Sequence, residues 1–267
     1  MTRGGDAMRQ GRAAGRRRLS ARRLLLWPLV GIVTLPLWAL LLHAGTSFAH
    51  LPPGSGAATA VSVLSSICAL LLTFLAGLPL AWWAASAPQR SQRLLELLLA
   101  VPLLLPPLVL GLVLAYVFGP TTGFGTWLTD MGIGVTNSFL GLTIAGFYEA
   151  APFFIYAAWA AFGALDRDIL EAAWLAGLSP LRAFWRVALP LAGPGLAIAS
   201  AMAWARTIGA FGAPIVLAYH PTGLPVGIWI ALSEFGLGPA LQLALVLVAI
   251  ALPLPLLAMG VARRAAR

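Results

Sequence analysis

Glu171–Pro190 reads EAAWLAGLSPLRAFWRVALP and is the most informative stretch of the chain. It lies between two long apolar runs and carries one glutamate, two arginines and one glycine. An arginine-bearing segment between apolar runs is typical of a loop on the cytoplasmic side of a membrane. Its helix start and stop signals predict two short helices joined at the glycine.

The first of these helices has signals at both ends. Asp166 is a suitable N-cap residue, because its side chain can accept a hydrogen bond from the free backbone N–H groups of the first turn. Asp168 and Glu171 follow in the first turns, where acids favour the positive end of the helix dipole. Gly177 suits the left-handed residue that stops a helix. A short helix that ends at Gly177 is therefore expected.

The second helix is expected to begin at Ser179 and Pro180, a cap residue followed by the residue favoured at the first helical position. Arg182 and Arg186 are four residues apart and share one face of it. Leu189-Pro190 is expected to end it. Two short helices joined by a glycine elbow make a compact knob that fits a groove in another protein.

The composition indicates an all-α integral membrane protein. Of 267 residues, 60% are hydrophobic and 9% are charged, and the charges cluster between apolar runs long enough to span a bilayer. A β-barrel is excluded, because no segment alternates apolar and polar residues. We expect six transmembrane helices, at about Leu24–Leu42, Ala58–Ala85, Leu94–Phe118, Ser138–Gly163, Leu191–Leu217 and Leu241–Val261. Residues 1–23 form a basic tail before them, residues 24–262 the membrane domain, and residues 263–267 a second tail.

The arginines predict the orientation of these helices, since the chain has no lysine. Of 17 basic residues, all but Arg206 precede the first span, follow the sixth, or lie between spans two and three or four and five. By the positive-inside rule, both termini and the Glu171–Pro190 loop are cytoplasmic. The arginines lack interleaved aromatic residues and a soluble binding fold, so nucleic acid is excluded as a partner. The basic tail suits anionic lipid headgroups.

The first span also resembles an export signal. Ser20–Leu26 reads SARRLLL, similar to a twin-arginine signal, and Ser47–Ala49 resembles a cleavage site. A retained anchor is the preferred interpretation, because the apolar run is long for a signal and another span follows it.

Several kinds of chemistry are excluded by missing residues. Without lysine the chain has no phosphate-binding P-loop, so energy from ATP must come from a partner. His-Glu-x-x-His and Gly-x-Ser-x-Gly motifs are also missing. Cys68 is the only cysteine, and His43, His50 and His220 are scattered, so we expect no metal, no cofactor and no enzyme activity.

The spacing of Glu171–Pro190 resembles the EAA loop of permease subunits in ATP-binding-cassette importers. That motif is Glu-Ala-Ala, three residues, Gly, nine residues and an Ile-x-Leu-Pro close, and Val187 stands where the family usually has Ile. The resemblance places the ATPase-coupling loop at about residues 164–190. It implies coupling roles for Glu171, Ala172, Ala173, Gly177, Arg182, Arg186, Leu189 and Pro190.

Other stretches extend the resemblance to about Leu94–Val261. Val101–Gly111 reads VPLLLPPLVLG, Ala205–Ala213 reads ARTIGAFGA and Leu224–Leu232 reads LPVGIWIAL. Their order is similar to the molybdate, tungstate and sulfate branch of type I importer permeases. Iron, thiamine and polyamine permeases share much of this sequence pattern and remain alternatives.

The resemblance implies a type I importer permease (MetI-like) fold in a bacterial inner membrane. It also implies two permease subunits, two cytoplasmic ATPases and an extracytoplasmic binding protein. This chain has one EAA loop, so it would supply half of the translocation pathway, paired with a second copy or a related permease. Specificity would reside largely in the binding protein.

One departure from the family lies in the fifth span. The oxyanion branch commonly reads Arg-x-x-Gly-Glu-Phe-Gly, whereas this chain has Ala210 in place of the glutamate after Arg206. A charge near mid-span needs a partner, and Glu149 lies at comparable depth in the fourth span. We expect Arg206 and Glu149 to pair, either as a fixed structural contact or beside the pathway. We also expect that a glutamate introduced at position 210 substitutes for Glu149. Gly209, Gly212 and Pro214 permit bending or close helix approach, as a gate requires, although small residues at a helix interface also serve plain packing. Gly209, Phe211 and Gly212 are candidates for the translocation path.

The outer loop Tyr219–Gly238 contains a second candidate element. Val226–Phe235 is expected to form a short amphipathic helix, and Glu234 is the only acid in the loop. Resemblance places this region at the outer gate beneath the binding protein. A re-entrant cap that seals the bundle is the alternative.

Two other functions fit the sequence less well. A secondary transporter needs paired intramembrane acids and an inverted repeat, but the predicted spans hold one clear mid-span acid and show no repeat. An intramembrane enzyme needs a nucleophile, a base or a metal set within the spans, and none is apparent.

Overall fold

The computed structural model describes residues 27–28, 30–42 and 51–265. All regular secondary structure in these ranges is helical, as expected from the composition. The described part of the chain before His50 belongs to a separate unit and contains the helix Val30–Leu42. The predicted tail 1–23, the start of the first span, the export-like cleavage site and Arg267 lie outside the described residues.

The second unit is built almost entirely from helices. In chain order they are α2 (Ser55–Ser86), α3 (Gln89–Leu104), α4 (Pro107–Phe118), α5 (Gly123–Asp130), α6 (Phe139–Gly163), α7 (Arg167–Leu175), α8 (Pro180–Ala183), a π-helical turn (Phe184–Ala188), α9 (Leu189–Ile208), α10 (Gly212–Leu217), α11 (Leu224–Phe235), α12 (Leu237–Ala251) and α13 (Pro253–Ala265).

Four segments in the described residues are long and apolar enough to cross a bilayer, and they correspond to predicted spans two, four, five and six. They are Ser55–Ser86, Phe139–Gly163, Pro180–Leu217 and Leu237–Ala265. The described helix of the first predicted span, Val30–Leu42, is shorter than these. The chain is therefore a multi-pass membrane protein.

The third predicted span, Leu94–Phe118, is not one straight helix. α3 and α4 meet at an angle of 105°. Pro106 and Pro107 are the cause, because each lacks a backbone N–H and disfavours helical geometry in the residue before it. Leu105 accordingly has extended backbone with ψ 131°. The pair α3–α4 is a broken span or a re-entrant segment.

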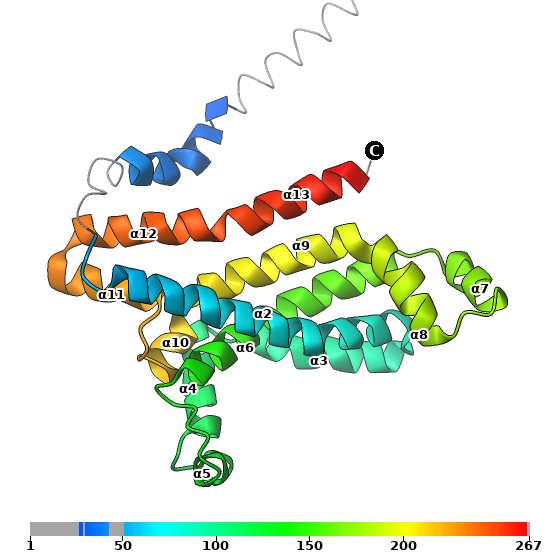
Figure 1. The fold of residues 1–267 in the computed structure, drawn as a ribbon, viewed down its shortest axis with the longest axis horizontal. Helices are drawn as coiled ribbons and strands as arrows, with labels where there is room; N and C mark the ends of the chain where they lie inside the picture. The colour runs from blue at the N-terminus through cyan, green and yellow to red at the C-terminus, as the bar shows by residue number, and fades with distance from the viewer. Residues whose placement is uncertain (1–26, 29, 43–50, 266–267) are drawn as a thin grey trace, which may run out of the picture. The chain divides into compact units, whose positions relative to one another are not determined.

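Helices α2, α6 and α9 form the core and lie side by side (Figure 1). Small residues let their backbones approach. A β-carbon on Gly77 of α2 would lie 2.8 Å from Phe154 of α6, and one on Gly146 would lie 3.1 Å from Ala69. Close packing of this kind replaces the hydrophobic effect as the main attraction between helices in a bilayer.

A second tight contact joins the two broken spans. A β-carbon on Gly212 of α10 would lie 2.6 Å from Pro107 Cβ of α4, and one on Gly111 would lie 2.8 Å from Ala213 Cα. Leu110, Leu114 and Leu217 bury their side chains around this contact. The start of α4 and the start of α10 are thus fixed to one another.

Candidate functional site

The first half of the predicted coupling loop has the expected geometry. The Asp166 side chain accepts a hydrogen bond from the backbone N–H of Asp168 at 3.0 Å, which caps α7. Gly177 has φ 83° and so occupies the left-handed region. The N–H of Leu178 bonds to the carbonyl of Ala173 at 3.1 Å and that of Gly177 to Trp174 at 2.9 Å. These two bonds are the Schellman arrangement, so the predicted glycine stop is confirmed.

The second half differs from expectation. Ser179 stands at the N-cap position, but its hydroxyl accepts a hydrogen bond from Arg182 Nε at 3.2 Å and not from the backbone. The predicted end at Leu189-Pro190 is wrong, because α8 continues through the π-helical turn directly into α9. Pro190 lies in the first turn of α9, where its missing N–H is tolerated. The loop is therefore connected rigidly to the fifth span.

The loop presents apolar side chains at one end of the bundle, and Figure 1 shows α7 and α8 beyond the ends of the core helices. Leu175 is 89% exposed and Leu181 68% exposed, and Trp174 and Trp185 are also exposed. Ala173 is buried, whereas the remaining EAA-motif side chains are exposed or partly exposed. Contiguous exposed apolar residues of this kind mark a protein interaction surface.

A cavity of about 240 Å3 separates α7 from the ends of α2 and α6. Its walls include Trp82, Phe162 and Trp174, and Arg167 and Glu171 also line it. The α7 part of the loop thus borders a hollow, whereas the Phe184 ring packs against Trp82 and Phe162, with centroids 5.3 Å and 6.0 Å away.

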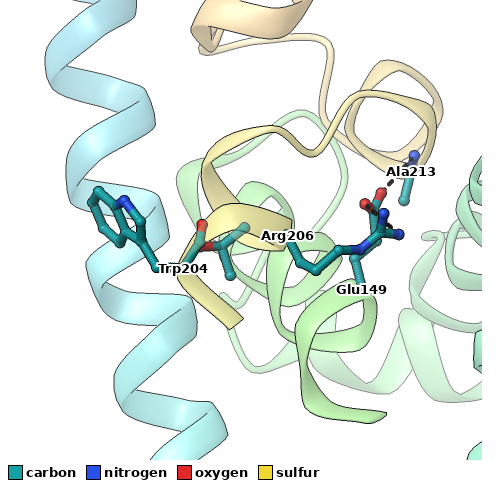
Figure 2. Close-up of polar contacts among 5 residues, drawn as sticks. Glu149, Trp204, Arg206 and Ala213 are labelled. Atoms are coloured by element: carbon teal, nitrogen blue, oxygen red, sulfur yellow. Dashed lines mark hydrogen bonds and ion pairs between the residues drawn. The ribbon is translucent and has the colours of Figure 1, made fainter. Parts of the chain in front are cut away.

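The intramembrane charges lie together, as Figure 2 shows. Arg206 Nη2 is 3.8 Å from Glu149 Oε2, a distance that makes an ion pair but is too long for a hydrogen bond. The other carboxylate oxygen, Oε1, accepts a hydrogen bond from the N–H of Ala213 at 3.4 Å. The guanidinium also lies over the Phe153 ring, 4.7 Å from its centroid. The role of this pair in transport stays a prediction.

Glu149 links the two halves of a broken span. α9 ends at Ile208 and α10 begins at Gly212, so the backbone between them is not helical. Arg206 lies in the last turn of α9 and Ala213 in the first turn of α10. A cation near a helix end and a carboxylate near a helix start are both favourable placements. One side chain on α6 therefore holds both ends of the break.

The depth of this site makes its charges expensive. Glu149 is ten residues from the start of α6 and 14 from its end. At 1.5 Å per residue these separations are about 15 Å and about 21 Å, so the carboxylate lies well inside a hydrocarbon core of about 30 Å. A lone arginine at such depth costs about 2.5–3.5 kcal/mol on insertion scales. The pairing offsets part of that cost.

The one-turn spacing expected between Arg206 and position 210 is not present, and the substitution of Glu149 by a glutamate at 210 stays a prediction. Because α9 ends at Ile208 with Gly209 as its cap, the four-residue spacing from Arg206 to Ala210 is not one turn of a helix. Ala210 is 7% exposed and lines a cavity of about 20 Å3 that Arg206 does not line. Gly212 packs against α4, and the Phe211 ring lies 6.1 Å from Trp229 of α11.

Sequence reasoning missed the polar lining of that cavity. Ser62, Ser65 and Ser66 on α2 are buried there, and Ser62 Oγ accepts a hydrogen bond from the N–H of Leu224 at 2.6 Å. This bond joins α2 to the first residue of α11. The three serines are spaced three and four residues apart within an apolar helix, and this spacing is the sequence signal that could have predicted a polar contact between helices.

The predicted outer helix is present as α11, Leu224–Phe235, at the opposite end of the bundle from α7 (Figure 1). Glu234 is exposed on it. An apolar groove of about 340 Å3 lies between α11, α12 and the start of α2. The gate role of Glu234 stays a prediction.

Other predicted polar residues do not join these sites. His220 is exposed, Cys68 is half-buried within α2, and His43 and His50 lie outside the described residues. Within the described ranges, no three His, Cys, Asp or Glu side chains are grouped to hold a metal ion.

Residues 77–267 match the family described as "Binding-protein-dependent transport system inner membrane component". A probable molybdenum ABC transporter permease protein of Haloferax volcanii is 37% identical over 183 residues, 68% of this chain and 66% of that protein. A probable sulfate transport system permease protein cysT of Nephroselmis olivacea is 32% identical over 165 residues. The chain covers 58% of this second relative and so spans less than two thirds of the length of either protein. The sulfate transport system permease protein CysT of Escherichia coli is 31% identical over 223 residues, 80% of each chain.

Solved structures give the same fold at low identity. A chain of the bacterial alginate ABC transporter, in complex with alginate pentasaccharide-bound periplasmic protein, has a TM-score of 0.70 at 17% identity over 95% of this chain and 96% of that chain. A chain of the MetNI methionine ABC transporter in an inward-facing conformation has a TM-score of 0.61 at 17% identity, covering 78% of this chain and 94% of that one. At these identities the similarity concerns the fold.

Proposed function

Because the chain belongs to the family of binding-protein-dependent transport system inner membrane components, we propose that it is a permease subunit of an ATP-binding-cassette importer. The exposed apolar loop at one end of the bundle supports this assignment most directly. Leu175 and Leu181 are exposed on helices that extend beyond the core helices. A loop that contacted only water would carry polar side chains at these positions. A cytoplasmic ATPase is the partner whose groove the two leucines fit.

The transported solute in this proposal is a small oxyanion such as molybdate, tungstate or sulfate. The names of the relatives support that substrate class, since they are molybdenum and sulfate permeases. An extracytoplasmic binding protein delivers the anion, in line with the periplasmic protein bound to the alginate transporter. The chain carries one coupling loop and supplies half of a pathway completed by a second permease subunit.

Transport follows from alternating access. ATP binding closes a pair of ATPase subunits and draws the α7–α8 loops together. Since α8 runs without interruption into α9, this movement reaches the Arg206 end of α9 as a displacement of one continuous helix. The fifth span breaks at Gly209–Phe211, where it can bend. The permease makes and breaks no covalent bond, and ATP hydrolysis belongs to the separate subunit.

Orientation is part of the proposal. Both termini and the α7–α8 loop face the cytoplasm, and α11 lies on the outer side. Arg90 and Arg93 at the start of α3 and Arg167 at the start of α7 carry the positive-inside signal. The end of α2 and the α7 loop border one cavity, so the turn that follows α2 and the loop lie at one end of the bundle.

Reconstitution tests the proposal. The chain is placed in proteoliposomes with the ATPase and the binding protein encoded beside it, and ATP-driven uptake of radiolabelled molybdate and sulfate is measured. We expect uptake that requires all three components. Failure of the chain to associate with the ATPase would contradict the permease assignment, and association without uptake of either anion would contradict the substrate class.

A further inference from the structure

We propose that Arg206 contacts the oxyanion during its passage and that Glu149 positions this arginine. The proposal rests on the proposed function, because it assigns a residue to the transport of an anion along this face of the permease. It concerns the chain's own contact with the solute, which is separate from recognition by a binding protein.

The guanidinium of Arg206 has unused hydrogen-bond donors. None of the described residues accepts a hydrogen bond from it, and the buried Nε atom in particular has no partner. Its side chain is 41% exposed. A hydrocarbon environment cannot satisfy these donors, so the exposed side of Arg206 faces water or a polar solute.

The two members of the ion pair differ in exposure. The Glu149 side chain is 4% exposed, against 41% for Arg206, so the acid lies behind the base. The N–H of Ala213 holds one carboxylate oxygen, while the other faces the guanidinium. Here the negative end is held within the helices and the positive end is presented outward.

Small neighbours leave the guanidinium accessible. Ala205 and Gly209 flank Arg206 on the exposed side of α9, and both are exposed themselves. A β-carbon on Gly209 would meet only the carbonyl oxygen of Ala205, at 3.1 Å. Phe153 supports one face of the guanidinium plane. Nη2 faces Glu149, and the exposed part of the side chain is left for a ligand. Trp204, two residues earlier, points the other way, toward α2 (Figure 2).

The chemistry of arginine fits an oxyanion. A guanidinium presents two parallel N–H groups that match two oxygens of one tetrahedral anion. Among the described arginines, Arg206 is the only one well inside a candidate spanning segment, Pro180–Leu217, where it lies in the last turn of α9 beside the break. An anion that crosses the middle of this subunit therefore meets one cation, at the break between α9 and α10.

The experiment uses the reconstituted complex and measures molybdate and sulfate uptake per ATP hydrolysed. Wild-type uptake is established first, and its absence would count against the proposed function and not against Arg206. The decisive variant combines Arg206→Gln with Glu149→Gln, which removes both charges together and leaves no unpaired acid. We expect it to assemble and its uptake per ATP to fall about ten-fold or more. Met202→Leu is the control, since Met202 is exposed on the same helix but carries no charge.

Arg206→Lys decides the question if the double variant does not assemble. Lysine keeps a cation for Glu149 but lacks the planar fork. Normal assembly with uptake lowered several-fold supports the proposal, whereas wild-type uptake overturns it. The proposal is equally overturned if the double variant transports at the wild-type ratio, because the pair is then only structural. Lowered assembly with normal uptake per assembled complex would assign Arg206 to the permease–permease interface and would also overturn it.

Discussion

Replacing Gly177 tests whether the α7–α8 loop couples this chain to an ATPase. Gly177 has φ 83°, and a β-carbon built on it meets nothing within 4 Å. A side chain there causes no clash, so the whole penalty comes from the left-handed backbone, about 1–2 kcal/mol for an L-residue. The loop can escape this strain only by giving up the two Schellman hydrogen bonds and turning α7 out of position.

That strain converts into a measurable loss of coupling. If the ATPase binds only the native loop, 1–2 kcal/mol lowers its affinity about 5- to 30-fold. Asparagine tolerates the left-handed region better than alanine, and valine tolerates it least. We therefore expect ATPase affinity and uptake per ATP to fall in the order Gly, Asn, Ala, Val, while the membrane helices stay folded.

Gly132 provides a matched control. It has φ 80° and equally open surroundings, but it lies between α5 and α6, on the predicted outer side. Gly132→Val imposes the same backbone strain and is expected to leave ATPase affinity unchanged. Wild-type affinity and uptake in Gly177→Val would refute the coupling assignment. Equal damage from Gly132→Val would show that the loss reflects general instability.

The remaining predictions concern topology, packing and the charge pair. In a Cys68→Ser background, cysteines at Thr122 and Thr222 should react with an impermeant thiol reagent added outside, and those at Ser91 and Ser179 should not; labelling of Ser179 from outside would invert the orientation. The same outcome as for Thr122 is expected at Ser47, which lies outside the described residues. Gly212→Ala should destabilise the purified protein by about 1–3 kcal/mol, because its β-carbon would lie 2.6 Å from Pro107 Cβ, whereas Gly193→Ala meets open space and should not lower the melting temperature. Glu149→Gln should impair assembly or uptake. Adding Ala210→Glu should not restore the lost function, because Ala210 lines the cavity that contains the serines of α2. Recovery to the wild-type level would show that positions 149 and 210 are equivalent.

The coupling loop shows which structural features local sequence signals can predict. Asp166 and Gly177 act through hydrogen bonds within a few residues, so their roles as cap and stop were predictable from the sequence alone. The same holds for apolar length, which located four of the spans. The end of α8 was mispredicted because Pro190 is compatible both with stopping one helix and with the first turn of the next. Only the continuous path through the π-helical turn decides between these outcomes.

Sequence by itself determined the membrane class, the EAA spacing and the presence of one acid and one base at similar depth. Tertiary structure decided what those charges do. Pro106 and Pro107 break the third span locally, but the packing of α4 against α10, which holds this break beside the one after Ile208, is not encoded in any local pattern. The two breaks also place Ala210 against the serines of α2 and leave Glu149 to join α9 to α10. Helical periodicity cannot predict these contacts, because it fails where the helix itself stops.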